Sequence, residues 1–277
     1  MASNTRSLRA PLPWRTALVT GASSGIGEAL SERLARDGVE VVLAARRLEK
    51  LEALASKLEA SGAKARPLRL DVTRTEETVE AIRRVDDEVG GLDLIVANAG
   101  LGRPQSARTL TWENTSEVFA INFMGAMATL TAVLPRMIER GRGHLVGMSS
   151  LVVYAPTPGA AAYRASKSGL TALLENLRAE LGNTGVSATA IHPGYVETPM
   201  ADNFRTRGPD GELLPAKRPP VIVSAEDAAS LIVGRLRKAP ARIDFPFSLM
   251  MMIKSVGALP ELVQGAIVRK MSAAVTE

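Results

Sequence analysis

Short, continuous apolar runs alternate with helical patterns along most of this 277-residue chain. The first run, residues 15–20, enters a glycine-rich turn, and apolar residues at helical spacing follow as far as Gly38. Further strands are expected at residues 39–44, 67–70, 92–97, 145–148, 186–191 and 243–245. Strands that are apolar throughout are typical of a parallel sheet covered by helices on both faces. The sequence therefore predicts an α/β fold with a single Rossmann-type, doubly wound parallel sheet of about seven strands.

Helices are expected at residues 48–58, 75–89, 116–140 and 163–181, with a last one that begins at Ser224. We expect three parts along the chain: an N-terminal arm at residues 1–13, a Rossmann-fold domain at 14–245 and a C-terminal apolar helical extension at 246–277. Within the domain, residues 199–223 are rich in proline, glycine and charge and lack clear periodicity. A loop of that length in a compact domain is usually functional.

The composition excludes several kinds of site. The chain has no cysteine, which rules out disulfides, thiolate metal sites and a cysteine nucleophile. Its two histidines, His144 and His192, are too few for a histidine-rich metal site, so no metal is expected. The net charge of +5 comes from scattered basic residues and only 4% of residues are aromatic, so a nucleic-acid partner is not expected.

No targeting or membrane-spanning segment is expected either. The first residues carry arginine but lack the apolar core of a secretory signal. No uninterrupted run of about 18 apolar residues occurs, so no spanning helix is expected. Together with the lack of cysteine, this favours a cytoplasmic protein.

The turn after the first strand reads Thr20-Gly21-Ala22-Ser23-Ser24-Gly25-Ile26-Gly27. Gly21 allows the tight turn, Gly25 lets the backbone approach a pyrophosphate, and Gly27 permits close packing of helix on strand. The start of the helix adds unpaired N–H groups and a partial positive charge. An ordinary glycine-rich turn is the alternative, but a strand before it and a helix after it favour dinucleotide binding.

Tyr163 and Lys167 lie four residues apart on a predicted helix and so share one of its faces. A nearby cation lowers the pKa of a phenol, which would let Tyr163 donate or accept a proton near neutral pH. Such a pair is also common on ordinary helices, so the neighbouring motifs must decide whether it is catalytic. Ser149-Ser150 ends the fifth strand, and the two side chains of adjacent strand residues point to opposite sides.

The order of these motifs resembles that of the classical short-chain dehydrogenase/reductase family, over about residues 14–245. The resemblance rests on the G-x-x-x-G-x-G turn, Asn98-Ala99-Gly100 after the fourth strand, Asn122 with Gly125, Ser150 placed 13 positions before Tyr163, Tyr-x-x-x-Lys, and Pro193-Gly194 followed by Val196 and Thr198. It implies an oxidoreductase that interconverts a carbonyl and an alcohol on a small molecule, with Tyr163 as general acid/base. The candidate pocket residues, named below, suggest that the substrate is apolar. The family also places a substrate lid at residues 199–223.

The resemblance assigns a role to each site residue. Asn122 would hold a water that links Lys167 to solvent, Ser150 would bind the substrate oxygen, and Lys167 would also bind the nicotinamide ribose. His192 is interpreted as structural. The expected cofactor-binding residues are Gly21, Ser23, Ser24, Gly25, Ile26, Gly27, Arg46, Arg47, Asp71, Val72, Asn98, Ala99, Gly100, Tyr163, Lys167, Pro193, Gly194, Val196 and Thr198.

The end of the second strand distinguishes NADP from NAD. An acid there would bind the ribose 2′-hydroxyl, whereas an arginine would accept a 2′-phosphate. The chain has Ala45 at that position, followed by Arg46 and Arg47. NADP(H) is therefore the expected cofactor, with NAD(H) as the alternative. Ser24 departs from the basic residue that many NADP-preferring relatives carry just before the second glycine.

Several alternatives stay open. A non-catalytic NADP(H)-binding sensor or scaffold is the second hypothesis, and an epimerase or dehydratase of the extended branch of the superfamily is the third. The apolar tail could cover the substrate pocket or pack on the domain, form a subunit contact, or lie on a membrane surface through Lys254, Arg269 and Lys270, in that order of preference. A homodimer or homotetramer is expected through the two long helices. Candidate pocket residues are Val152, Val153, Tyr154, Met200 and Phe204.

Overall fold

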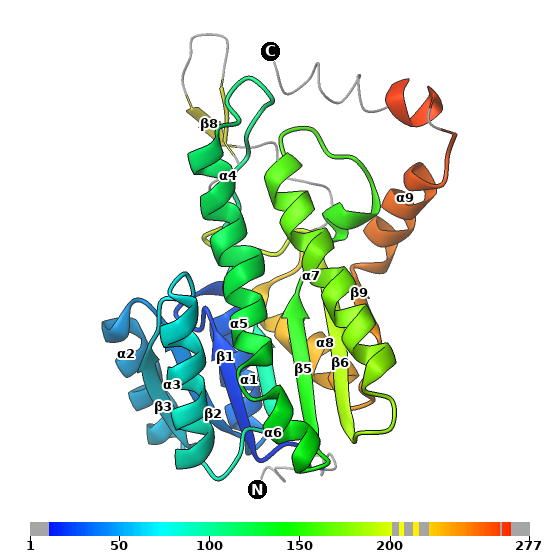
Figure 1. Ribbon diagram of the computed structural model, residues 1–277. Coiled ribbons are helices and arrows are strands. Elements are labelled where there is room, and N and C mark those ends of the chain that lie inside the picture. Colours follow the sequence, from blue (N-terminus) through cyan, green and yellow to red (C-terminus); the bar gives the residue numbers. More distant parts are fainter. Residues whose placement is uncertain (1–10, 201–204, 208–212, 216–221, 261, 267–277) are drawn as a thin grey trace, which may run out of the picture.

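The computed structural model describes residues 11–200, 205–207, 213–215, 222–260 and 262–266 (Figure 1). Within them, a seven-stranded sheet has the order β3-β2-β1-β4-β5-β6-β9 and is parallel throughout. This confirms the predicted fold class. The strands are β1 (Thr16–Thr20), β2 (Glu40–Ala45), β3 (Ala65–Arg69), β4 (Leu94–Ala97), β5 (Gly143–Met148), β6 (Val186–Pro193) and β9 (Arg242–Phe245).

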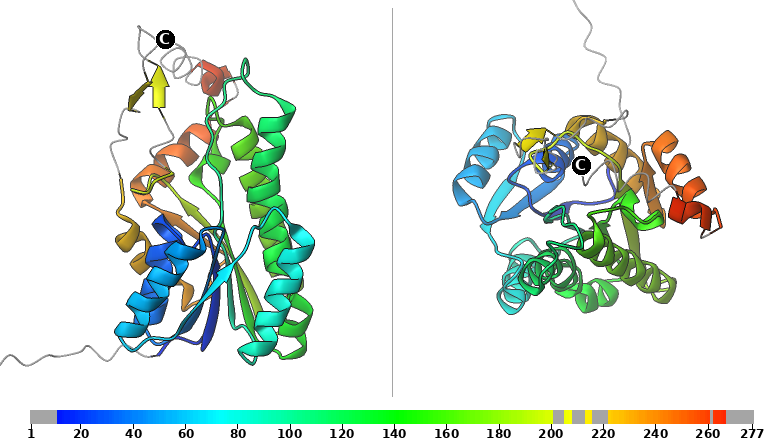
Figure 2. Two further views of the ribbon diagram at one scale, coloured as in Figure 1. Left: turned by 90° about the vertical axis from the view of Figure 1, so that its left-hand side faces the viewer. Right: turned by 90° about the horizontal axis from the view of Figure 1, so that it is seen from above.

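Alternate residues of each central strand enter two separate cores. In β1, Ala17 and Val19 belong to one core and Leu18 to the other. The first core lies under α1 (Gly25–Arg36), α2 (Leu48–Ala60) and α8 (Ala225–Leu236). The second lies under α3 (Thr75–Glu88), α5 (Ala126–Thr131) and α7 (Ala161–Glu180). Helices therefore cover both faces of the sheet, as the view from above shows (Figure 2).

The strand order determines where along the carboxyl ends of the strands a binding crevice opens. β1 pairs with β2 on one side and with β4 on the other, so the chain changes direction across the sheet at β1. In a parallel sheet, a crevice opens at that point beyond the carboxyl ends of the strands. Gly21 follows β1, Arg46 follows β2 and Asn98 follows β4 at these carboxyl ends, whereas Asn122 and Tyr163 lie on helical segments.

The long helix predicted at residues 116–140 is wrong as a single regular helix. The chain instead forms α4 (Trp112–Phe119), a π-helical segment η1 (Ala120–Gly125), α5, and a separate α6 (Leu134–Glu139). Pro135 explains the break before α6, because proline has no N–H for the helical ladder and its ring clashes with the preceding turn. The π turn contains Asn122, and such turns often occur at functional sites.

The sequence predicts no spanning helix, because it has no run of about 18 apolar residues; helix length and average composition are a second criterion for such a helix. Among the described residues, the helical stretch Trp112–Glu139 meets that criterion by length and composition. Half of the most apolar 18 residues of this stretch is buried inside the fold, and Leu130 and Val133 pack in the second core. The sequence-based expectation considered only uninterrupted apolar runs, whereas this stretch contains polar residues and is apolar in its mean hydropathy.

Part of the predicted lid is described. Within residues 199–223, β7 (Arg205–Arg207) and β8 (Leu213–Pro215) pair antiparallel. Val196 and Val223 also form an isolated parallel bridge at the base of this segment. Phe204, a candidate pocket residue, lies outside the described residues.

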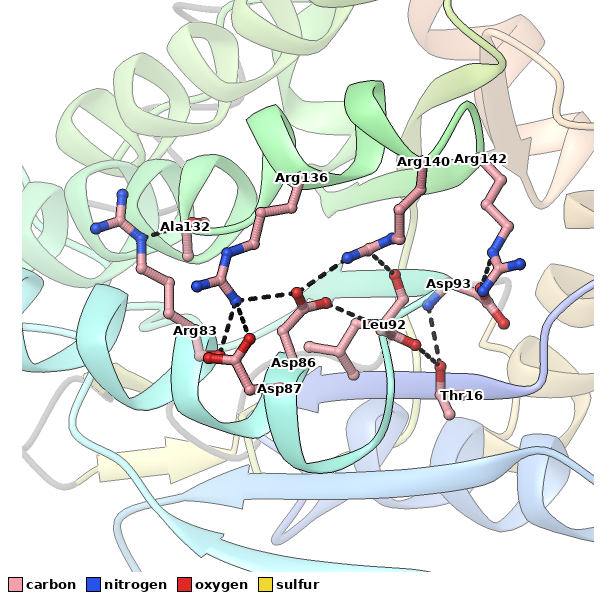
Figure 3. A network of polar contacts seen from close by, with 11 residues as sticks. Thr16, Arg83, Asp86, Asp87, Leu92, Asp93, Ala132, Arg136, Arg140 and Arg142 are labelled. Carbon is pink, nitrogen blue, oxygen red and sulfur yellow. Dashed lines mark hydrogen bonds and ion pairs between the residues drawn. The ribbon is translucent and has the colours of Figure 1, made fainter.

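A network of ion pairs ties the helices together at the amino end of the sheet (Figure 3). The Asp86 side chain is 3% exposed and binds Arg136 at 3.2 Å and Arg140 at 3.0 Å. Asp86 also accepts a hydrogen bond from the Leu92 N–H at 2.7 Å. Burial alone would raise the pKa of Asp86, but these hydrogen bonds outweigh it and hold the pKa below its usual value. Asp86 therefore joins α3, α6 and the start of β4 as an ionised carboxylate.

Replacing Asp86 by Ala is expected to lower the free energy of unfolding by about 3–5 kcal/mol, because it leaves a buried N–H and a partly buried guanidinium without their partner. Asp87→Ala is the matched control: the Asp87 side chain is 69% exposed and binds Arg136 at 2.8 Å. Its loss should cost about 1 kcal/mol or less. Urea unfolding measures both variants, and equal losses would contradict the assignment of the network to Asp86.

Candidate active site

The glycine-rich turn is built so that backbone and a dinucleotide can come close. Gly21 has a φ of 70°, and a Cβ atom there would lie 2.9 Å from Asn98 Nδ2. A Cβ at Gly27 would collide with the carbonyl oxygen of Gly21. The helix α1 then begins at Gly25, and its N-cap Ser24 makes no side-chain capping bond, so the first amides of α1 remain available to an anion. These features fit the pyrophosphate of a dinucleotide.

The segment after β6 lies over this turn. Gly25 has a φ of 60°, and a Cβ atom on it would stand 2.9 Å from Cγ2 of Thr198. Thr198 itself is partly buried, and its hydroxyl is 3.4 Å from the Val196 carbonyl. The structure therefore brings together Thr198 and the phosphate-binding turn, two motifs that are more than 170 positions apart.

The ends of β3 and β4 carry residues that also stabilise the edge of the sheet. Asn98 Nδ2 donates to the Thr20 carbonyl at 2.9 Å, and the Thr20 hydroxyl accepts from the N–H groups of Asn98 and Ala99. Asp71 accepts hydrogen bonds from the N–H and hydroxyl of Thr73. The Val72 side chain is buried, and Gly125 of the π turn packs closely against it. The side chains of Asn98, Asp71 and Val72 thus hold the edge in shape.

The two arginines after β2 differ in their contacts. Both are exposed, but Arg47 reaches across to the phosphate-binding turn, where its Nη2 lies 2.8 Å from Ser23 Oγ and 3.0 Å from Ser24 Oγ. Arg46 lies near Asp71, whose pKa it helps to lower. A guanidinium therefore stands beside Ser24, where the sequence itself has no basic residue.

Ser149 and Ser150 point in opposite directions. Ser149 is buried, and its hydroxyl is bonded to the Lys167 carbonyl at 3.1 Å and to Thr171 at 2.8 Å. Ser150 is partly exposed; its hydroxyl accepts the Val152 N–H at 3.2 Å, and its proximity lowers the pKa of Tyr163, although less than burial raises it. Of this pair, Ser150 is therefore the serine that acts on the phenol.

The expectation that Lys167 lowers the pKa of Tyr163 is wrong for the protein chain itself. Burial raises the pKa of Tyr163 above its usual value, and the nearby Ser150 only offsets part of that effect. Lys167 Nζ lies 5.8 Å from the centre of the Tyr163 ring and donates to the Met148 carbonyl at 2.7 Å. Burial lowers the pKa of Lys167 to about 8. The phenol is therefore protonated at neutral pH and suited to donating a proton.

Asn122 is fully buried in the π turn and fixes the loop after β4. Its Oδ1 accepts the Leu101 N–H at 2.7 Å, while its Nδ2 donates to the Leu101 carbonyl at 3.0 Å and to Ser166 Oγ at 3.2 Å. A Cβ atom on Gly100 would lie 3.4 Å from both Asn122 Oδ1 and Lys167 Nζ. These two polar atoms therefore face the same point beside Gly100.

The site contains a polar cluster that sequence reasoning missed. His192 is fully buried, and its Nδ1 lies 2.8 Å from Asp244 Oδ1. Tyr154, expected only as a pocket residue, donates its hydroxyl to the same carboxylate at 3.0 Å. The available signal was Asp244, an acid inside the short apolar strand at residues 243–245.

The C-terminal extension packs against this part of the site. Its helix α9 (Phe247–Gly257) contacts β9 and the 3-10 helix η2 (Leu151–Tyr154), which follows Ser150 (Figure 1). Leu249 is buried, and a Cβ atom on Gly194 would lie 2.7 Å from it. Phe247, Met251 and Met252 remain exposed. One side of α9 therefore packs on the domain, as in the first of the three interpretations of this tail.

Residues 15–208 match the protein family described as short chain dehydrogenase. The chain belongs to the short-chain dehydrogenase/reductase family. A relative from Myxococcus xanthus, called an uncharacterized oxidoreductase, is 42% identical over 264 residues, which are 95% of this chain and 99% of that protein. The protein is accordingly an oxidoreductase that acts on a CH–OH or C=O group.

Two solved structures show related short-chain dehydrogenase/reductases with nicotinamide cofactors. An alcohol dehydrogenase from Thermococcus sibiricus, complexed with 5-hydroxy-NADP, is 30% identical with a TM-score of 0.70, over 83% of this chain and 94% of that one. A short-chain dehydrogenase from Sphingobium yanoikuyae, in complex with NADPH, is 26% identical with a TM-score of 0.75, over 93% and 95% of the two chains. These likenesses support a nicotinamide cofactor for this short-chain dehydrogenase/reductase.

The lowered pKa of Lys167 predicts a pH dependence of stability. Between pH 8 and the usual value of 10.5, the unfolded chain binds this proton and the folded protein does not, so folding becomes more favourable as the pH rises. Wild type should therefore gain stability relative to Lys167→Met across this range, by about 3 kcal/mol, since one pKa unit corresponds to about 1.4 kcal/mol.

Urea unfolding of both proteins at several pH values tests this expectation. Lys57→Met is the control, because Glu32 raises the pKa of Lys57 and its side chain is 69% exposed. Wild type should show no such gain over Lys57→Met. A stability difference from Lys167→Met that does not change with pH would show that the Lys167 ammonium is not destabilised by burial.

Proposed function

We propose that the protein is an NADP(H)-dependent oxidoreductase that interconverts a ketone or aldehyde with its alcohol on an apolar small molecule. The observation that carries this proposal is the grouping of Ser150, Tyr163 and the buried Lys167 at the carboxyl ends of the strands, where Lys167 Nζ lies 5.8 Å from the Tyr163 ring and Ser150 acts on the phenol. That arrangement gives one substrate oxygen both a hydrogen-bond donor and a proton donor. A homodimer or homotetramer remains a prediction, because a single chain is described.

In this proposal the bound nicotinamide supplies the hydride for reduction, or accepts it in the reverse direction. Ser150 binds the substrate oxygen and stabilises the negative charge that develops on it. Tyr163 transfers a proton to that oxygen, or takes one from the alcohol in oxidation. Lys167 stabilises the phenolate that reduction leaves behind, and a water held between Asn122 Oδ1 and Lys167 Nζ would return the proton from solvent.

The preference for NADP(H) is proposed from Arg46 and Arg47. The end of β2 has no acid that could accept a hydrogen bond from a ribose 2′-hydroxyl or repel a 2′-phosphate. Arg47, held by Ser23 and Ser24 at the edge of the phosphate-binding turn, stands where a 2′-phosphate would need a cation. It replaces the basic residue that Ser24 does not provide.

Tyr163→Phe is expected to lower kcat by about 10²–10⁴, because the proton can no longer be transferred from the phenol. The Kd for NADPH should stay unchanged. Tyr195→Phe, which alters an exposed tyrosine, is the control and should keep wild-type activity. Steady-state kinetics on ketones and aldehydes with apolar bodies, together with calorimetric titration of NADPH, measures both quantities. Near-normal kcat in Tyr163→Phe would contradict the proposal; NADPH binding without turnover of any carbonyl would favour the sensor.

Replacing either Arg46 or Arg47 by Ala is expected to raise the Kd for NADPH by about tenfold or more, since a hydrogen bond between charged groups contributes about 1.5–3 kcal/mol. The Kd for NADH should change little. Arg66→Ala is the control, because Arg66 binds Glu40 near the opposite ends of these strands. Equal weakening of both cofactors, measured by titration calorimetry, would contradict the assignment of the two arginines to a 2′-phosphate.

A further inference from the structure

Asp244 lies at the centre of a polar cluster that the proposed reaction does not use. The cluster consists of Tyr154, His192, Asp244 and Lys254, and we call it the Asp244 cluster. Asp244 Oδ1 accepts from the Tyr154 hydroxyl at 3.0 Å and lies 2.8 Å from His192 Nδ1. The other carboxylate oxygen, Oδ2, accepts from Lys254 Nζ at 2.8 Å. Both oxygens of this largely buried carboxylate are therefore engaged.

Lys254 also covers the ring of Tyr154, because its Nζ lies 4.3 Å from the centre of that ring. The imidazole of His192 is tilted against the same ring, with 5.2 Å between the two ring centroids. Burial alone would raise the pKa of Asp244, but the bonds from His192 and Lys254 hold it well below its usual range. Asp244 is thus ionised at neutral pH. Lys254, which belongs to the C-terminal extension, supplies its counter-charge at 38% side-chain exposure.

The helix that carries Lys254 is packed directly on η2. A Cβ atom on Gly257, at the end of α9, would collide with the carbonyl oxygen of Tyr154. At the other end of η2, the Cδ1 atom of Leu151 would stand 3.3 Å from a Cβ on Gly194, which also faces Leu249 of α9. The Asp244 cluster and the Gly257 approach therefore fix α9 against Tyr154, and Gly194 lies between Leu151 of η2 and Leu249 of α9.

Residues 151–154 form one unit with Ser150. The Ser150 hydroxyl accepts the Val152 N–H at 3.2 Å, and its carbonyl accepts the Val153 N–H at 3.3 Å. Arg164, next to Tyr163, donates to the carbonyl oxygens of Val152 and Val153 at 3.1 and 3.3 Å. The near end of η2 is thus held by α7, and its far end, Tyr154, is held by the Asp244 cluster.

We propose that Lys254 is a positioning residue, whose ion pair with Asp244 holds Tyr154, and through it η2 and the hydroxyl of Ser150, in place. The C-terminal extension thereby acts on a residue that touches the substrate, at a distance along the chain of about 100 positions. The catalytic part of this inference rests on the proposed function of Ser150. The positioning of η2 by Lys254 does not, and it is tested without substrate.

The test is hydrogen exchange of the backbone amides in full-length Lys254→Met, which keeps the length of the side chain and removes its charge. The Val152 and Val153 amides, both bonded to Ser150 in wild type, should exchange about tenfold faster, the effect of losing one charge-assisted hydrogen bond from a local opening. Tyr154→Phe, which removes the hydroxyl that contacts Asp244 and His192, should have a similar effect. Lys254→Arg, which keeps the charge, should retain the slow exchange of wild type. Lys238→Met, at an exposed lysine after α8, should also exchange at the wild-type rate.

Faster exchange in α9 with no change at Val152 and Val153 would overturn the proposal, because Lys254 would then only anchor its own helix. On a substrate that the enzyme reduces, Lys254→Met should lower kcat several-fold while the Kd for NADPH stays the same. Faster exchange at Val152 and Val153 with unchanged kcat would retain the positioning of η2 and overturn its link to the reaction. Failure of the proposed function itself would instead show as absence of turnover in wild type.

Discussion

The pairing of β1 with β2 on one side and β4 on the other is the constraint on which the site depends. Parallel pairing brings the carboxyl ends of all the strands to one edge, where short turns carry the functional residues. The Thr20 hydroxyl binds the Asn98 and Ala99 amides, so the ends of β1 and β4 form one surface. Gly21 and Gly27 then let the phosphate-binding turn lie directly on that surface, because any Cβ at either position would meet Asn98.

Buried charges at the amino ends and at the carboxyl ends of the strands have different partners. At the amino edge, Asp86 is matched by Arg136 and Arg140 and by a backbone N–H, so its charge serves to join helices. At the carboxyl ends of the strands, Lys167 is buried and donates to the Met148 carbonyl oxygen, and its pKa falls to about 8. A buried ammonium held this way is less stable in the folded protein than in water.

The C-terminal extension forms part of the same edge. Asp244 at the end of the sheet holds Tyr154 and Lys254 together, so α9 and η2 share one counter-charged carboxylate. Behind them, His192 Nε2 lies 3.1 Å from the Thr171 hydroxyl, which donates to the Lys167 carbonyl on α7. The helix α7, the segment Ser150–Tyr154 and the helix α9 are therefore connected through one continuous set of polar contacts.

The amino-acid pattern was sufficient to predict the fold class and the position of each motif along the chain. Continuous apolar runs require a sheet covered on both faces, and the glycine spacing and the Tyr163–Lys167 interval are local features that a pattern can contain. The break in the predicted helix at residues 116–140 was partly readable from Pro135, whereas its π turn was not.

The contacts between distant segments, and the electrostatics that follow from them, depend on how the elements pack and could not be predicted from local patterns. Arg47 beside Ser24, Thr198 over Gly25 and Asp244 beside His192 join residues that are 23 to 173 positions apart. The raised pKa of Tyr163 likewise results from burial. Local spacing places side chains on one face of an element, but how far each is removed from water, and which charge it meets there, depends on how the elements pack.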